Sequence, residues 1–79
     1  MSCDYVKVLD LAKEGNLQEA HKIVQKYSDE LSCLIHAYIH RAEGDLSNAN
    51  YWYRRVGIKK PSISLEEELQ TLYNKAQES

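Results

Sequence analysis

The chain has 79 residues, enough for one domain, and a domain of this size buries only about 60–65% of the surface that its unfolded chain exposes. Such a thin core leaves no room for a substrate pocket walled on all sides. Hydrophobic residues make up 43% and charged residues 28% of the chain, and the net charge is −2. These values favour an ordinary globular protein and argue against one whose entire surface attracts nucleic acid.

The chain begins with Met1, Ser2 and Cys3, and no apolar run follows. We therefore expect neither a signal peptide nor a membrane-spanning segment. Two cysteines, Cys3 and Cys33, are too few for a disulfide framework, so we expect free thiols in a reducing compartment. Together these features predict a cytoplasmic protein with no membrane partner.

Apolar side chains recur at the spacing of a helix along nearly the whole chain, and no alternating pattern predicts a strand. The first predicted helix spans about residues 4–14 and ends at Gly15, a residue that tolerates the left-handed conformation. The second follows Asn16, which we expect to form a capping box with Glu19, and it ends near residue 27.

The third predicted helix follows Ser28, its expected N-cap, and ends at Gly44. The fourth follows Asp45 and ends at Gly57. Each of these two helices is thus expected to begin after an N-cap residue, whose side chain accepts a hydrogen bond from a backbone N–H of the first turn. Each is expected to end at a glycine.

A connector stiffened by Pro61 precedes the fifth predicted helix, which starts at Ser64 because Ser64 and Glu67 have the spacing of a capping box. The predicted architecture is a single all-α domain over residues 1–79. Its parts are a first helix hairpin, a second hairpin and a C-terminal capping helix, at about residues 4–27, 29–57 and 64–78.

The motif Glu-Gly-(Asn/Asp)-Leu-x-x-Ala occurs twice, starting at Glu14 and at Glu43. Its glycine permits a left-handed turn, its Asn or Asp caps the next helix, and its small Ala lets two helices approach closely. Each unit is a helix hairpin whose apolar face needs a neighbour, which stacking supplies.

At these residues the chain resembles the tetratricopeptide repeat family over about residues 4–78. The matching positions are Leu11, Gly15, Asn16, Leu17, Ala20 and Val24 in the first unit and Ala37, Gly44, Asp45, Leu46, Ala49, Tyr53 and Pro61 in the second. The resemblance implies a right-handed stack of two helix-turn-helix units with a capping helix, and a role in binding peptides or protein segments. Residues 36–57 are also similar to a segment of small bacterial proteins, which implies no function.

The chain departs from the family pattern at Lys7, His36 and His40, where the family usually has apolar or aromatic residues. The two units are also offset by fewer residues than a full repeat of about 34. Two units are fewer than the three that such stacks usually need, so self-association, for example as a homodimer, is a further expectation.

Cys33, His36 and His40 share one face of the third predicted helix, opposite its apolar stripe. Histidines at positions i and i+4 can share a metal ion, and a thiolate one turn earlier can join them. No second Cys/His pair follows at zinc-finger spacing, and Cys3 or His21 contributes only if the fold brings it near. We favour partial burial of these residues over metal binding, and expect no cofactor and no bound zinc.

Cys33 lies within a predicted helix, whose backbone N–H groups are already hydrogen-bonded and so offer no oxyanion hole. No Ser-His-Asp spacing, glycine-rich phosphate loop or pair of carboxylates in a cleft is found. The sequence therefore predicts that the protein is not an enzyme.

On the fourth predicted helix, Trp52 and Tyr53 point toward the core, whereas Asn48, Tyr51 and Arg55 form an outward stripe. Exposed Tyr and Arg are residue types that anchor interfaces. The alternative is that Tyr51 and Arg55 pack on the fifth helix or on each other, and the sequence does not decide between the two.

Between residues 34 and 63 there are five Lys or Arg residues against two acidic ones, while the rest of the chain is acidic. We expect this basic rim, beside a groove lined by the first and third helices, to bind an acidic peptide or protein segment. Nucleic-acid binding is the alternative, and a metal-responsive module at His36 and His40 is a third. The predicted partner-binding residues are Tyr38, Arg41, Asn48, Tyr51, Arg54, Arg55, Lys59 and Lys60, and we expect the cations among them to lie at least partly in water.

Overall fold

The computed structural model of the protein describes residues 3–78 and folds them into five α-helices. In chain order these are α1 (Tyr5–Lys13), α2 (Leu17–Val24), α3 (Glu30–Ala42), α4 (Leu46–Arg55) and α5 (Leu65–Glu78). No strand occurs within residues 3–78. The predicted all-α fold with five helices is therefore confirmed. Within the same residues, no helix combines the length and hydropathy needed to cross a membrane.

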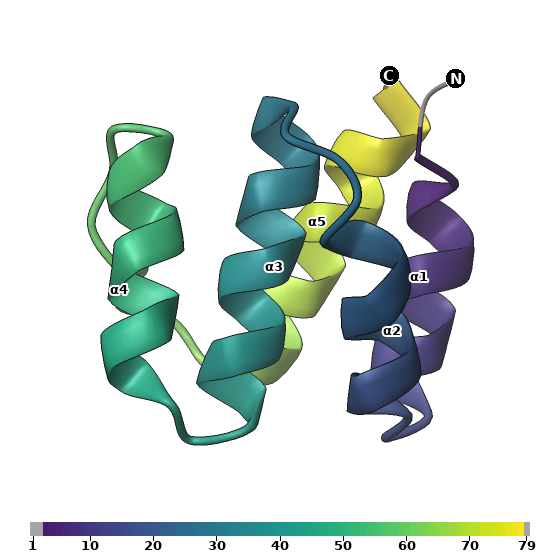
Figure 1. The fold of residues 1–79 in the computed structure, drawn as a ribbon, viewed down its shortest axis with the longest axis horizontal. Helices are drawn as coiled ribbons and strands as arrows, with labels where there is room; N and C mark the ends of the chain where they lie inside the picture. Colours follow the sequence, from purple (N-terminus) through teal and green to yellow (C-terminus); the bar gives the residue numbers. More distant parts are fainter. Residues whose placement is uncertain (1–2, 79) are drawn as a thin grey trace.

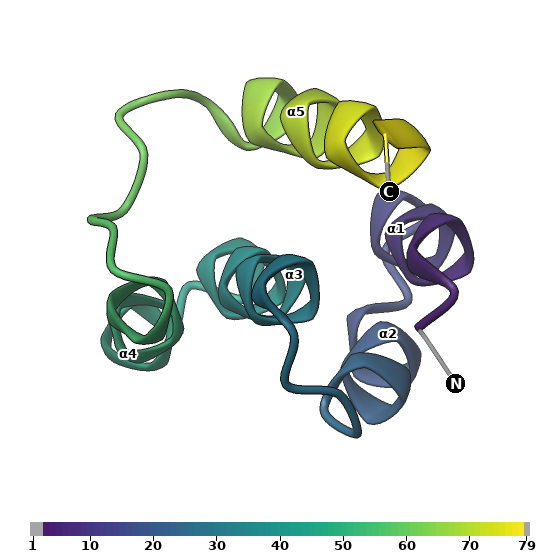
Figure 2. The ribbon, with the colours of Figure 1, turned by 90° about the horizontal axis from the view of Figure 1, so that it is seen from above.

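The helix α3 lies at the centre of the molecule (Figures 1 and 2). The hairpin of α1 and α2 packs on one side of α3, and α4 packs on the other side. Among the five helices, α3 is the one whose backbone lies close to that of α4. The last helix, α5, lies across α3 and α1 and contacts both (Figure 2). The two helices expected to line a groove, α1 and α3, are therefore both in contact with α5 of the same chain.

The glycine of each copy of the repeated motif follows the end of a helix and has the left-handed conformation. Gly15 follows α1 with φ of 90°, and Gly44 follows α3 with φ of 82°. The side chain of Asp45 accepts a hydrogen bond from the backbone N–H of Asn48, as expected for the N-cap of α4. Ser64 and Glu67 form the predicted capping box, in which each side chain accepts from the backbone N–H of the other at 3.1 Å.

Two predicted caps need correction. Asn16 precedes α2 but its side chain makes no capping hydrogen bond. The N-cap of α3 is Asp29 and not Ser28, because the Asp29 carboxylate accepts from the backbone N–H of Ser32 at 3.2 Å and from the Ser32 hydroxyl at 2.7 Å. A carboxylate offers more acceptor sites than a hydroxyl, and it accepts a third hydrogen bond from the Tyr5 hydroxyl at 2.6 Å.

The main core lies among α1, α2, α3 and α5, and a smaller one lies between α3 and α4. Both alanines of the repeated motif are fully buried: Ala20 belongs to the main core, and Ala49 packs with Ala37 and Tyr53 in the smaller one. The small side chains allow the close helix approach that the motif predicts. Tyr38, expected to contact a partner, is only 6% exposed and belongs to the main core.

A buried polar group joins α3, α4 and α5. The Arg41 guanidinium donates to the Glu68 carboxylate at 2.7 Å and also to the backbone carbonyl of Ile63. The buried Tyr53 hydroxyl donates to the second oxygen of Glu68. The Arg41 side chain is only 13% exposed. Arg41 therefore holds the helices together, which corrects its assignment to the partner-binding rim.

Candidate functional site

The remaining cations of the predicted rim lie at the end of α4 and in the loop that leads to α5. Arg54, Arg55, Lys59 and Lys60 are all exposed. Among residues 3–78, no carboxylate lies within ion-pair distance of any of these four. We call these four residues the basic surface.

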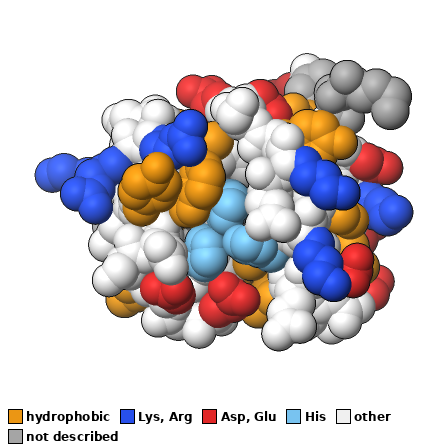
Figure 3. All heavy atoms as spheres, viewed as in Figure 1, with side chains coloured by type: hydrophobic (Ala, Val, Ile, Leu, Met, Phe, Trp, Pro, Cys, Tyr) orange, Lys and Arg blue, Asp and Glu red, His pale blue; other side chains and the backbone are white. Residues whose placement is uncertain are grey.

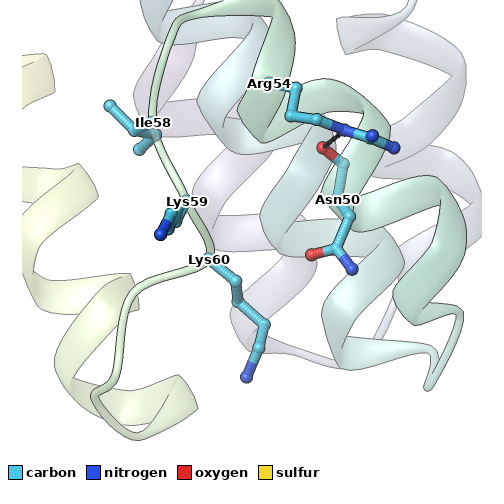
Figure 4. Close-up of a pocket in the computed structure, with 5 residues that line it drawn as sticks. All are labelled: Asn50, Arg54, Ile58, Lys59 and Lys60. Carbon is cyan, nitrogen blue, oxygen red and sulfur yellow. Dashed lines mark hydrogen bonds between the residues drawn. The ribbon is translucent and has the colours of Figure 1, made fainter.

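A hollow of about 430 Å³ opens beside the basic surface (Figure 4). Asn50 and Arg54 line it from α4, and Ile58, Lys59 and Lys60 line it from the loop. The Arg54 Nε donates to the backbone carbonyl of Asn50 at 3.4 Å, which helps to orient its guanidinium. Ile58 adds an exposed apolar side chain, so the hollow offers both positive charge and apolar contact area.

The outward stripe of α4 has its own contacts. Tyr51 is exposed, with its ring edge-on to Trp52, and the Arg55 guanidinium lies 4.9 Å from the centre of the Trp52 ring. Both residues thus pack around an aromatic side chain of their own helix. Asn48 is also exposed, but its amide donates to the Asp45 carboxylate at 2.6 Å and so supports the N-cap.

A second candidate site contains all three histidines of the chain, which are His21 on α2 and His36 and His40 on α3. One ring nitrogen from each lies within 4.8 Å of those of the other two. The imidazoles form one pale-blue patch on the face shown in Figure 3. His36, expected on the side of the helix away from the core, is only 4% exposed, because α2 and Trp52 of α4 cover it.

Contacts within this histidine cluster are close. The Nε2 atoms of His21 and His36 lie 2.9 Å apart, a distance at which one N–H donates to the other nitrogen. The rings of His36 and His40 stack with centroids 5.0 Å apart. Cys33 is not part of the cluster: its thiol is buried and donates to the Ser28 carbonyl at 3.6 Å.

The electrostatics of the cluster favour a neutral imidazole at His36. Burial lowers the pKa of His36 to about 4, and positive charge on His21, His40 and Arg55 acts in the same direction. At neutral pH the His36 ring therefore has one unprotonated nitrogen, whose lone pair is available to a Lewis acid. Burial also raises the pKa of the Cys33 thiol, which disfavours a reactive thiolate.

The sequence alone did not assign His21 to this cluster, because it lies 15 residues before His36 on another helix. The residue before His21 in the sequence does indicate that His21 lies near another helix. Ala20, the small residue of the repeated motif, predicts a close approach of α2 to a neighbouring helix, and His21 follows it directly.

Comparisons with protein-family models, with curated proteins and with solved structures found no match. The resemblance to the tetratricopeptide repeat family therefore stays a prediction from the residues quoted above.

Proposed function

We propose that the protein is an interaction module without catalytic activity, and that its basic surface binds an acidic segment of another protein. The observation that supports this most directly is the set of four exposed cations with no carboxylate partner within residues 3–78. Charges left unpaired in water remain available to an incoming carboxylate, and guanidinium groups bind carboxylates in bidentate geometry.

The apolar side chains around the basic surface favour a peptide over nucleic acid. Ile58 lines the hollow and is exposed, so an acidic peptide that carries an apolar residue gains a contact there. Single-stranded nucleic acid needs exposed aromatic rings for base stacking. Here Tyr53 is buried and Trp52 is stacked on His36, so Tyr51 is the exposed ring on α4.

We propose the cytoplasm as the compartment in which this interaction takes place. Cys3 and Cys33 are free and buried, which suits the reducing cytoplasm. The tetratricopeptide-like arrangement remains a proposal, and with α5 over α1 and α3 the contact surface shifts from the groove to α4 and the following loop. A homodimer would add a second copy of this surface.

The test compares two labelled probes, a Glu-rich peptide containing Leu residues and an oligothymidylate of similar length, by fluorescence anisotropy. We expect the peptide to bind more tightly at physiological salt. The variant Arg54→Glu/Arg55→Glu should weaken peptide binding at least about tenfold, because each reversed charge replaces an attraction by a repulsion.

The matched control is Lys7→Glu/Lys26→Glu, which makes the same change in net charge at two exposed lysines outside the basic surface. It should lower peptide affinity only slightly. Equal losses in the two double variants would mean that net charge alone attracts the peptide and would contradict the proposal. Tighter binding of the oligothymidylate, with a steep dependence on salt, would favour nucleic acid instead.

A further inference from the structure

We propose that His21, His36 and His40 bind one zinc-class divalent metal ion between α2 and α3. The three histidines offer one ring nitrogen each within 4.8 Å of one another. Two imidazole nitrogens that share a tetrahedral zinc ion lie about 3.3 Å apart. The widest separation thus has to close by about 1.5 Å, a movement that side-chain torsions supply while the backbone stays in place.

Two helices hold the ligands in this arrangement. His36 and His40 lie four residues apart on α3, so they project from one face of successive helical turns. His21 comes from α2, which packs against α3 and contributes Ala20 and Val24 to the main core. The site is therefore set by core packing and not by a mobile loop, which lowers the entropic cost of binding.

Unsatisfied ring nitrogens form the second, independent observation. The Nδ1 atoms of His36 and His40 are buried and have no hydrogen-bond partner. Whichever nitrogen of the His21–His36 pair carries the proton, the Nδ1 of His36 stays unpaired. A buried polar atom without a partner is costly, and such atoms are rare in folded proteins. Rotation of the His36 ring onto a metal ion converts its unpaired Nδ1 into a ligand, whereas the Nδ1 of His40 can donate to the carboxylates beside it.

Two carboxylates lie beside the cluster, and the cations near it are Lys22 and Arg55. The Glu43 carboxylate lies 3.2 Å from the Nδ1 of His40, at ion-pair distance but outside hydrogen-bond geometry, and the Asp45 carboxylate lies 3.9 Å from the same atom. Carboxylates next to ligating histidines orient the ring and strengthen it as a ligand. A hollow of about 310 Å³ lined by Gln18, His21, Lys22, His40 and Glu43 opens onto the cluster, and leaves space for a water molecule as fourth ligand.

This inference revises the expectation, drawn from the sequence, that no zinc binds. That expectation considered two histidines and a cysteine on one helix, whereas the structure replaces the cysteine with a third histidine from α2. The proposal does not rest on the function proposed for the basic surface, so the two proposals can fail separately.

The test is calorimetric titration of Zn²⁺ into protein from which any affinity tag has been removed. We expect one ion per chain and a rise in Tm of at least about 5 °C at saturating zinc. Co²⁺ should give the intense visible absorption of a four-coordinate ion. Cu²⁺ should quench the fluorescence of Trp52, the only tryptophan of the chain, because its ring stacks on His36.

His21→Gln should weaken zinc binding more than about 100-fold, since losing an outer carboxylate alone costs 10–100-fold. Gln18→Ala, which changes an exposed residue of the same hollow one turn earlier on α2, should bind zinc as the wild type does. If His21→Gln does not fold, His40→Gln replaces it, and circular dichroism establishes which variant is native. Zinc binding that is absent in the wild type, or unchanged in a folded histidine variant, would overturn the proposal.

Discussion

The indole ring of Trp52 stacks on the imidazole of His36, with centroids 3.9 Å apart and ring planes 17° from parallel. This pair connects α4 to α3 beside the small core of Ala37, Ala49 and Tyr53. Because the Arg55 guanidinium also lies on the Trp52 ring, the basic surface and the histidine cluster share one aromatic residue. A change in either site is therefore measurable through Trp52 fluorescence.

Enlarging the alanines of the repeated motif should destabilise the fold. Ala20→Leu and Ala49→Leu each add volume at fully buried positions between helices, and each should lower the free energy of unfolding by about 1–3 kcal/mol. Ser47→Leu, at an exposed position of α4, is the control and should change it by less than about 0.5 kcal/mol. Urea denaturation measures all three, and wild-type stability in both alanine variants would refute the hairpin packing.

Gly44 tests the backbone conformation at the turn between α3 and α4. Its φ is 82°, and apart from Gly44 itself and its two chain neighbours no residue has an atom within 4 Å of the position that a Cβ would take, so a substitution there costs conformational energy and not a clash. Gly44→Val should destabilise by about 1–2 kcal/mol, and Gly44→Asn by less, because Asn tolerates the left-handed region. The order of the two melting temperatures is the readout, and a Val variant as stable as the Asn variant would contradict the geometry.

The polar group around Glu68 should matter more for stability than any cation of the basic surface. Arg41→Met removes the partner of a carboxylate that is only 3% exposed and should destabilise by about 3 kcal/mol. Arg54→Met, at an exposed arginine, should cost less than about 0.5 kcal/mol. In a double-mutant cycle, Arg41→Met/Glu68→Leu should recover part of the loss, because no buried charge is left unpaired. Additive losses would show that the pair is not coupled.

Stability should fall in alkaline solution. The hydrogen bond to Asp29 raises the pKa of Tyr5 to about 12, and burial together with the hydrogen bond to Asp10 raises the pKa of Tyr73 to about 12. Burial and the Glu68 carboxylate raise the pKa of Tyr53 as well. Because these folded-state values exceed the unfolded value of about 10, the contribution to stability is complete below pH 10 and is lost as the pH rises toward 12.

The measurement for this prediction is urea denaturation between pH 8 and pH 11.5, with tyrosinate absorbance followed in parallel. The variant Tyr5→Phe/Tyr73→Phe removes two of the ionising hydroxyls and should flatten the alkaline decline. A decline of equal steepness in the variant would mean that other groups cause it.

Local signals in the sequence predict where the helices begin and end. They do not predict contacts between residues far apart in the chain, which depend on the tertiary arrangement. Gly44 and Asp45 mark the end of α3 and the start of α4 because the φ of one and the side chain of the other act within a single turn. The pairing of Arg41 with Glu68 spans 27 residues and depends on how α5 folds back, which no local pattern specifies.

The same distinction between local signals and tertiary contacts applies to the candidate sites. The exposure of Arg54, Arg55, Lys59 and Lys60 agrees with a prediction made from helix periodicity and from the composition of the loop. The spacing of Tyr38 places it in the apolar stripe of α3, and it is buried there. Its prediction as a partner-binding residue disregarded this spacing. The histidine cluster needs the packing of α2 on α3, so the sequence predicted only its two members on α3.

The most direct test of the proposed function is photo-crosslinking in cells of the native organism from a photoreactive amino acid placed at Ile58, an exposed residue that lines the hollow. Val6 on α1 is the matched control, because both side chains are apolar and 43% exposed. Mass spectrometry of the adducts should show protein segments rich in Asp and Glu at position 58 and not at position 6, and the Arg54→Glu/Arg55→Glu background should abolish them. Adducts to nucleic acid at position 58, or the same adducts from both positions, would contradict the account.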